Sequence, residues 1–341
     1  MNALLDRLLS GGTLGEREAE AFGASLARGE VAPAVAAAAL AALRVRGETP
    51  AELRGLAAAL RRLARRPAID PGLRAVDVVG TGGDGSGSLN ISTGVALLVA
   101  AIGLPVIKHG NRAVTSRSGS ADLLEALGMA LPLDEQAAAR CLERTGFTFL
   151  FAPYYHPAMR EIAALRRELG VRTVFNMLGP LVNPAEPPLG LIGAFSADAA
   201  RRMADAFAGM AIERVFVVHG EPGWDEATPC GPFLLLDVRP GEVRERTRDP
   251  AEWGLPRAHP SGLAGGDAAE NADALREVFG GKRGAFRDAL VLGAALVTEL
   301  AGLADDPLEA RRIAEDAIDG GRAHALLDRL AATGGREAAD G

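Results

Sequence analysis

The sequence predicts an α/β fold with a mostly parallel central sheet and flanking helices, preceded by a smaller all-helical N-terminal domain. Two observations lead to this prediction. Residues 1–68 contain only helical patterns, whereas from residue 71 onward short apolar stretches alternate with polar loops and helical patterns. Such alternation is typical of a parallel sheet, whose ligands bind at the carboxyl ends of the strands. The loops that follow the strands are therefore candidate sites.

The N-terminal part predicts four helices. A leucine stripe marks the first, and further helical patterns cover 16–28, 31–46 and 49–66. The last begins at Thr49, which is followed by a proline, a residue that suits the first helical position. Their apolar faces must be covered by one another or by the rest of the protein.

The remainder of the chain supplies the strands and their covering helices. Strands are predicted at 75–79, 104–108, 147–151, 189–195 and 214–219, and a hairpin at 233–238 and 242–246. Helices are predicted to open near Ser92, to follow the polar loop after residue 108, and then to lie at 134–145, within 154–170, at 198–208, from Ala268 after a cap at Asp267, and at 290–301, 307–319 and 323–332. Prolines and glycines make 171–185 a fixed loop, and 334–341 is expected to be a frayed tail.

The loop after the first strand is rich in glycine. Its glycines are Gly80, Gly82, Gly83, Gly85 and Gly87. A backbone without Cβ atoms lets successive N–H groups approach an anion, and the helix that follows adds its positive end. The stretch therefore predicts a phosphate cradle.

Two other phosphate-binding motifs fit this loop less well. The letters also match the dinucleotide pattern G-x-G-x-x-G, but that pattern needs an acidic residue near the end of the second strand, where Lys108 and His109 stand. Asp84 would repel a bare pyrophosphate unless a metal ion or a ribose hydroxyl intervenes. A Walker-type ATPase is disfavoured because no G-K-[ST] follows the loop.

The second loop is dense in cationic and hydroxyl side chains. They are Lys108, His109, Asn111, Arg112, Thr115, Ser116, Arg117, Ser118 and Ser120. Such donors suit phosphate oxygens and sugar hydroxyls. Since both loops are expected at one edge of the sheet, they predict a sugar phosphate as the ligand.

Composition narrows the functional class. The chain has 341 residues, of which 48% are apolar, enough for a sizeable core. A net charge of −7 argues against nucleic-acid binding, and no apolar run is long enough to span a membrane. The two cysteines have neither metal-binding spacing nor a disulfide framework, and no signal-peptide pattern is present. We therefore expect a cytoplasmic protein.

Several motifs resemble one family. GTGGD at 80–84, NIST at 90–93, KHGNR at 108–112 and SGSADLLE at 118–125 are similar to the signature of the anthranilate phosphoribosyltransferases of tryptophan biosynthesis. The resemblance continues, in order, through FLFAPYYHPAM at 149–159, RREL at 166–169, RTVFNMLGPLVNPA at 172–185, the acidic pair at 225–226 and GGDAAENA at 265–272. It thus covers nearly the whole chain.

The resemblance implies transfer of the phosphoribosyl group of phosphoribosyl diphosphate to the amine of anthranilate, with release of pyrophosphate. It implies Mg2+ held by Ser92, Asp225 and Glu226, although Ser92 also suits a helix N-cap and an isolated acidic pair is usually solvated. For the donor it nominates Gly80, Gly83, Asp84, Ser88, Asn90, Ser92, Thr93, Lys108 and Ser120, with Ser116 as a weaker candidate because loop hydroxyls often cap turns.

For the aromatic acid the resemblance nominates Asn111 and Arg166. Arg166 can pair with a carboxylate through two hydrogen bonds, and Asn111 can bond an amine or a carbonyl. An aromatic amine is already a neutral nucleophile at pH 7, so we expect Lys108, His109 and Asn111 to position the substrates and no residue to act as an obligate base.

The family also implies a domain organisation. The helical domain, residues 1–70, would be completed by about 166–188 and would form a homodimer contact, while 71–165 and 189–341 would form the α/β domain that binds the donor. A helical cap on the sheet without a dimer role is the simpler alternative.

Two departures from the family pattern leave the acceptor open. Trp224 stands where a smaller residue is expected, and no asparagine lies near Gly293. The alternatives are a transferase for another aromatic amine, a nucleoside phosphorylase-like enzyme with no need for the acidic pair, and a non-catalytic protein that keeps the fold.

Overall fold

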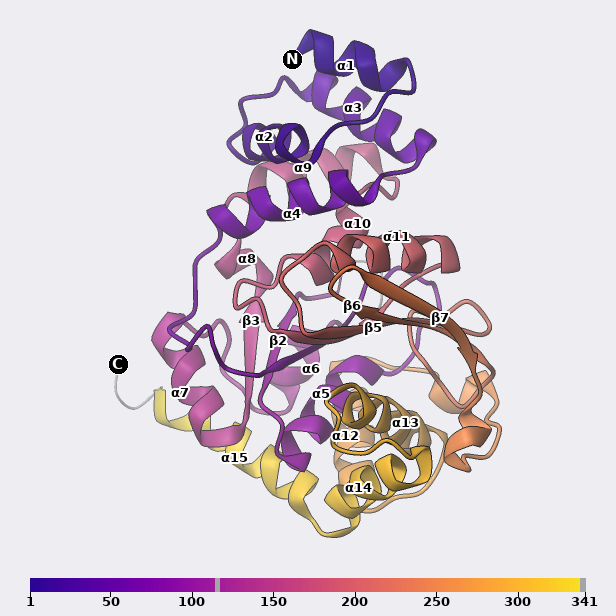
Figure 1. The fold of residues 1–341 in the computed structure, drawn as a ribbon. Coiled ribbons are helices and arrows are strands. Elements are labelled where there is room, and N and C mark those ends of the chain that lie inside the picture. The colour runs from indigo at the N-terminus through magenta and orange to yellow at the C-terminus, as the bar shows by residue number, and fades with distance from the viewer. Residues whose placement is uncertain (114–116, 338–341) are drawn as a thin grey trace.

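The computed structural model describes residues 1–113 and 117–337, and it places a helical domain at one end of the molecule (Figure 1). The fourth helix begins as its sequence suggests. Thr49 accepts a hydrogen bond from the Glu52 backbone N–H at 3.2 Å, and the Glu52 side chain accepts one from the Thr49 N–H at 2.8 Å. The helices of this domain are α1 (Asn2–Leu9), α2 (Glu16–Ala27), α3 (Pro33–Arg46) and α4 (Pro50–Leu63).

The second domain is built on a seven-stranded sheet of order β3-β2-β1-β4-β5-β6-β7. The first five strands run parallel, and β6 and β7 are antiparallel to their neighbours. The chain order reverses between β1 and β4, and ligands bind at such a switch point in open α/β sheets. The strands are β1 (Val76–Gly80), β2 (Val106–Gly110), β3 (Phe147–Phe151), β4 (Leu189–Gly193), β5 (Arg214–Gly220), β6 (Phe233–Arg239) and β7 (Glu242–Arg248).

Helices cover both faces of the sheet (Figure 1). The α-helices after residue 70 are α5 (Ile91–Ile102), α6 (Ser120–Ala126), α7 (Glu135–Thr145), α8 (Ala152–Tyr155), α9 (Met159–Leu169), α10 (Phe175–Leu178), α11 (Ala197–Ala208), α12 (Ala268–Phe279), α13 (Ala285–Leu300), α14 (Pro307–Asp319) and α15 (Arg322–Glu337). Of these, α9 packs against α2 and α3, and α10 against α4, so both belong with the helical domain (Figure 1). Short 3-10 turns occupy Gly179–Leu181, Pro250–Trp253 and Pro260–Leu263.

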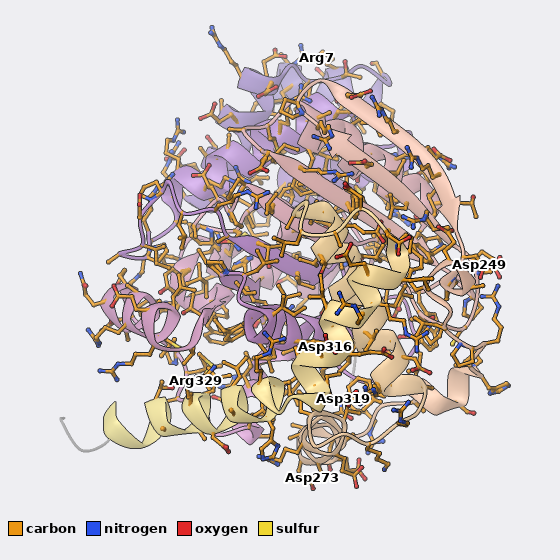
Figure 2. All side chains as sticks on the ribbon, turned by 60° about the horizontal axis from the view of Figure 1, so that its bottom comes forward. Arg7, Asp249, Asp273, Asp316, Asp319 and Arg329 are labelled. Atoms are coloured by element: carbon orange, nitrogen blue, oxygen red, sulfur yellow. The ribbon has the colours of Figure 1, made fainter. Side chains whose placement is uncertain are left out.

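The side-chain alternation of the strands divides the core in two. In β5, Phe216 and Val218 pack with α5 and α13, whereas Val215 and Val217 pack with α11 and the helical domain. Charged side chains such as Arg329 stay at the periphery (Figure 2). The second core is continuous from the sheet to α2 and α4, so it joins the helical domain to one face of the sheet.

The predicted fold class is confirmed, and several boundaries need correction. The second strand extends to Gly110, so Lys108 and His109 lie on β2 and not in the polar loop. Helix α13 begins at Ala285 and not at 290, because the buried Phe286 and Ala289 extend its apolar face. Within 171–185, expected to be a loop, α10 and a 3-10 turn form.

The C-terminal expectation is also corrected. The backbone remains helical through Glu337, beyond the predicted end at 332, and residues 338–341 lie outside the described residues. The helix therefore continues through Gly334 and Gly335. Backbone hydrogen bonding along α15 outweighs the roughly 1 kcal/mol by which each glycine disfavours a helix. Across the described part of the chain, no helix combines the length and the apolar character needed to cross a membrane.

Candidate active site

The glycine loop leaves β1 at the switch point of the sheet. Gly82, Gly83, Gly85 and Gly87 adopt φ values between 59° and 78°. A Cβ atom on any of them would meet no neighbour within 4 Å, so conformation and not space demands glycine there. The loop leads into α5, whose first-turn N–H groups face the same edge of the sheet.

Glycines that end three neighbouring strands make room for the acidic pair. A Cβ on Gly80 would collide with the Asp225 carboxylate, one on Gly193 with the Asp225 carbonyl oxygen, and one on Gly220 with the Glu226 carbonyl oxygen. The sheet edge and the 225–226 segment therefore touch backbone to backbone. Sequence reasoning missed Gly193 and Gly220, because the strands were predicted at 189–195 and 214–219 and the structure ends them at these two glycines.

The acidic pair joins the glycine loop to α5. Asp225 accepts a hydrogen bond from the Gly82 N–H at 2.5 Å, and its own N–H donates to Asp84 at 3.2 Å. Glu226 accepts one from the Ser92 N–H at 3.1 Å. Asn90 and not Ser92 is the N-cap residue of α5, which corrects the N-cap interpretation and leaves the Ser92 hydroxyl in the first turn.

The three carboxylates repel one another. Burial and then repulsion from Asp84 raise the pKa of Asp225 to about 7, and burial and then repulsion from Asp225 raise the pKa of Glu226 to about 8. A cation placed among these oxygens would relieve this repulsion, so the donor set fits a hard divalent ion. Within 1–113 and 117–337, no group of three or more acidic, His or Cys side chains could hold a metal ion by itself.

Lys108 lies behind this site on β2 and is only 1% exposed. Its ammonium donates to the Val78 carbonyl oxygen and lies 3.4 Å from the Ser92 hydroxyl. Burial lowers the pKa of Lys108, while Asp77, Glu226 and Asp225 act in the opposite direction. The Lys108 ammonium group therefore lies beneath the first turn of α5 and not in an open loop.

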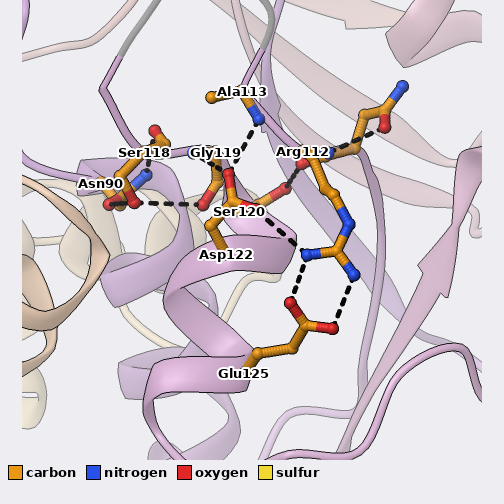
Figure 3. A network of polar contacts seen from close by, with 9 residues as sticks. Asn90, Arg112, Ala113, Ser118, Gly119, Ser120, Asp122 and Glu125 are labelled. Atoms are coloured by element: carbon orange, nitrogen blue, oxygen red, sulfur yellow. Dashed lines mark hydrogen bonds and ion pairs between the residues drawn. The ribbon is translucent and has the colours of Figure 1, made fainter.

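Polar contacts hold the described ends of the second loop (Figure 3). Asp122 accepts hydrogen bonds from the N–H groups of Ala113 and Gly119, each at 2.9 Å, and Arg112 pairs with Glu125. The Ser120 hydroxyl donates to the Asn111 carbonyl oxygen at 3.1 Å, and the amide oxygen of the exposed Asn111 side chain accepts from the Arg112 N–H at 2.7 Å. Ser116 and Thr115, predicted from the sequence, lie outside the described residues.

His109, near the end of β2, packs against His156, which follows α8. The buried rings of His109 and His156 meet edge to face at 5.1 Å, and they bond the carbonyl oxygens of Gly179 and Val182. Burial is the main cause that lowers the pKa of His109 to about 3 and that of His156 to about 4. Both rings are thus neutral at pH 7. The structure brings this pair to the 3-10 turn that begins at Gly179.

The half-buried Arg166 extends from α9, with its guanidinium 5.9 Å from the centre of the Phe175 ring. Burial lowers its pKa, and no carboxylate of the described residues pairs with it. Of the other predicted residues, Ser88 accepts a hydrogen bond from the Ser86 hydroxyl at 3.2 Å, and Thr93 is buried in the first turn of α5.

The two departures from the family pattern have structural roles. Trp224 is 7% exposed and packs in the core beneath the acidic pair, and its backbone exchanges hydrogen bonds of 2.9 Å with Gly220. Gly293 lies where α13 crosses α5, and a Cβ there would collide with Val95. Neither residue replaces a nominated ligand.

Comparison with known proteins gives the same assignment for both domains. Residues 2–64 match the family described as glycosyl transferase family, helical bundle domain, and residues 72–324 match its a/b domain. Anthranilate phosphoribosyltransferases of Rubrobacter xylanophilus and Methylobacterium radiotolerans are 47% and 48% identical. Each alignment covers 96% of this chain, and 95% and 94% of the respective relative.

Solved structures of anthranilate phosphoribosyltransferases have the same fold as this chain. The anthranilate phosphoribosyltransferase of Thermus thermophilus is 42% identical with a TM-score of 0.90, over 97% of this chain and 98% of that one. The Saccharomyces cerevisiae enzyme in complex with PRPP and Mg is 26% identical with a TM-score of 0.88, over 98% of each chain. With this identity extending over both domains and the predicted motifs gathered at one sheet edge, the chain belongs to the anthranilate phosphoribosyltransferases of the glycosyl transferase family.

Proposed function

We propose that this chain transfers the phosphoribosyl group of phosphoribosyl diphosphate to the amine of anthranilate, giving N-(5-phosphoribosyl)anthranilate and pyrophosphate in tryptophan biosynthesis. The observation that carries the proposal is the meeting of the glycine loop, the first turn of α5 and the Asp225–Glu226 pair at the switch point of the sheet. The yeast relative has been crystallised with PRPP and Mg, and with 4-fluoroanthranilate.

The donor would lie across the glycine loop and the N-terminus of α5, where N–H groups favour phosphate oxygens. Asp225, Glu226 and the Ser92 hydroxyl would hold Mg2+ with the donor. When bound, magnesium would offset the negative charge of the pyrophosphate. Lys108, buried beside Ser92, adds positive potential from below.

The acceptor would lie toward α9 and the histidine pair. Arg166, free of acidic partners in the described chain, would pair with the carboxylate of anthranilate, and Asn111 would bond its amine or carboxylate. His109, neutral at pH 7 because of its lowered pKa, would line the pocket and would not take up the proton of the amine. Lys108, His109 and Asn111 therefore have positioning roles.

Pyrophosphate would leave C1 of the ribose as positive charge develops on the sugar, and the aromatic amine would attack the opposite face. The proton that the amine nitrogen gives up after the new N–C bond forms would pass to water. The chain's contribution is charge stabilisation and alignment, because a neutral amine needs no strong base.

Two further features belong to the proposal. The helical unit, residues 1–70 with 166–188, would form the contact of a homodimer, with 71–165 and 189–341 as the donor-binding domain. We also propose a cytoplasmic location, because the two cysteines have neither metal-binding spacing nor a disulfide framework.

The first experiment follows the fluorescence of anthranilate after addition of phosphoribosyl diphosphate and Mg2+. We expect the wild type to consume anthranilate and the double variant Asp225→Asn/Glu226→Gln to be slower by on the order of 100-fold, because the leaving group loses its counter-charge. Glu221→Gln, an exposed carboxylate of the same loop, is the matched control and should keep the wild-type rate.

A double variant with the wild-type rate would refute the role of the acidic pair. A wild type that binds the donor but leaves anthranilate unchanged would refute the acceptor, and the assay would then be repeated with other aromatic amines.

A further inference from the structure

The GGDAAENA motif at 265–272 has no role in the site described so far, yet the segment before α12 is paired with the end of the glycine loop. The Leu89 N–H donates to the Leu263 carbonyl oxygen at 2.9 Å, and the Gly265 N–H donates to that of Gly87 at 2.8 Å. Between them Ser88 and Ala264 form an antiparallel bridge. The loop that would hold the donor phosphates is therefore fixed by a chain segment far away in sequence.

Gly265 makes this pairing possible. A Cβ atom on it would lie 2.5 Å from the Ser88 carbonyl oxygen and 2.9 Å from the Leu89 nitrogen, closer than real Cβ atoms approach backbone. Space and not backbone conformation thus requires glycine here.

Asn271 continues the connection from the segment to α5. Its amide oxygen accepts a hydrogen bond from the Gly266 N–H at 2.7 Å, and its NH2 group donates to the side-chain oxygen of Asn90 at 2.8 Å. Asn90 in turn donates to the Ser118 carbonyl oxygen at 3.1 Å (Figure 3). Turning either amide over would place two donors or two acceptors against each other, so the chain of bonds has one direction.

The bond from Asn271 to Asn90 does not serve the helix that carries Asn271. The N-terminus of α12 is already capped, because Asp267 accepts from the N–H groups of Ala269 and Glu270, and Glu270 accepts from that of Asp267. Asn271 is 2% exposed; its bond with Gly266 holds the segment just before α12, and its bond with Asn90 runs from α12 to the start of α5. A purely structural role in α12 would leave this arrangement without a reason.

We propose that Asn271 is a positioning residue for donor binding, acting through Asn90, which precedes the first turn of α5. The inference rests on the proposed function, since it says that Asn271 of α12 supports the site for phosphoribosyl diphosphate. The hydrogen bonds of Asn271 set the direction of the Asn90 amide. Together with the 263–266 segment, they set the path of residues 87–90.

The test uses Asn271→Ala, Asn90→Ala and the double variant in the full chain. Calorimetry measures the dissociation constant of phosphoribosyl diphosphate with Mg2+, and hydrogen exchange measures the backbone protection of residues 87–90. We expect Asn271→Ala to weaken donor binding about tenfold, as when a hydrogen bond between neutral groups is lost, and to raise exchange at 87–90. The KM for anthranilate should change by less than about twofold.

The double variant distinguishes positioning from general destabilisation. If Asn271 acts through Asn90, the double variant binds the donor no more weakly than Asn90→Ala alone. Leu275→Ala, a buried apolar residue on the same helix, should lower the melting temperature without raising exchange at 87–90, and the exposed Asp273→Asn should resemble the wild type.

Additive losses in the double variant, or unchanged exchange at 87–90 in Asn271→Ala, would overturn the proposal. A wild type that binds no phosphoribosyl diphosphate would instead overturn the proposed function, and the exchange measurement would still decide whether Asn271 holds the loop.

Discussion

At the scale of single residues, burial decides what each ionisable side chain contributes. Burial lowers the pKa of Lys108, and the neighbouring carboxylates of Asp77, Glu226 and Asp225 oppose that shift. The histidine pair has no such carboxylate partners among the described residues, so His109 and His156 are held neutral. Lys108 and the acidic pair thus lie around the first turn of α5, and the neutral imidazole pair lies at the 3-10 turn that begins at Gly179.

The neutral His156 makes stability depend on pH. Its pKa falls from about 6.5 in the unfolded chain to about 4 in the folded protein, so between these values the unfolded state binds the extra proton. The stabilisation is complete above pH 6.5 and is lost as the pH falls toward 4. In urea unfolding at pH 7 and 4.5, we expect His156→Gln to lose less stability on acidification than the wild type, by about 1–3 kcal/mol.

The exposed His324→Gln is the control for that measurement. This variant removes a histidine outside the buried His109–His156 pair, and its stability is compared with the wild-type pH dependence. If His156→Gln also followed it, His156 would not titrate differently in the folded and unfolded states.

At the scale of elements, the ends of parallel strands build the site. Gly80 of β1, Gly193 of β4 and Gly220 of β5 let the acidic segment pass close to the sheet edge. The position of Asp225 therefore depends on glycines that bind nothing themselves.

We predict that Gly193→Ala displaces this segment. The added Cβ would collide with the Asp225 carbonyl oxygen, and a misplacement of about 1 Å at an active site can cost on the order of 100-fold in kcat/KM. Steady-state kinetics of phosphoribosyl transfer, with circular dichroism to confirm folding, measures the effect. Gly190→Ala on the same strand is the control, because its Cβ would lie 3.3 Å or more from its neighbours.

Full activity of a folded Gly193→Ala variant would show that the acidic segment tolerates displacement. It would also remove the argument that the strand-end glycine positions Asp225.

At the scale of the whole molecule, exposed apolar side chains gather on the helical unit. Among the described residues, Met1, Leu9, Val45 and Val171 are large apolar side chains at least 50% exposed in this unit, and Val45 reaches 88%. A shallow groove that includes Leu4 and Phe22 lies between α1 and α2. Such surfaces are costly to leave in water and support the proposed homodimer contact.

We expect the wild type to sediment as a dimer, and Leu9→Glu/Val45→Glu to raise the dimer dissociation constant at least tenfold, because charges would enter an apolar interface. Leu303→Glu/Leu308→Glu, also exposed but outside the helical unit, should leave the dimer intact. A wild type that is monomeric at micromolar concentration would refute the dimer.

The sequence by itself determined the local elements and their order. Thr49 and Asp267 cap their helices as predicted, and the parallel strands and the hairpin lie close to their expected positions. These features follow from side-chain periodicity and from residues that act within one turn of chain, which is why a single sequence suffices to find them.

Only the tertiary structure decided how the motifs meet. Three features join residues that are far apart in the chain. They are the burial of Lys108 beneath α5, the close approach of the acidic pair to the glycines that end three strands, and the bond between Asn271 and Asn90. Close backbone approach and the direction of an amide depend on where separate elements pack, and no local pattern encodes that geometry.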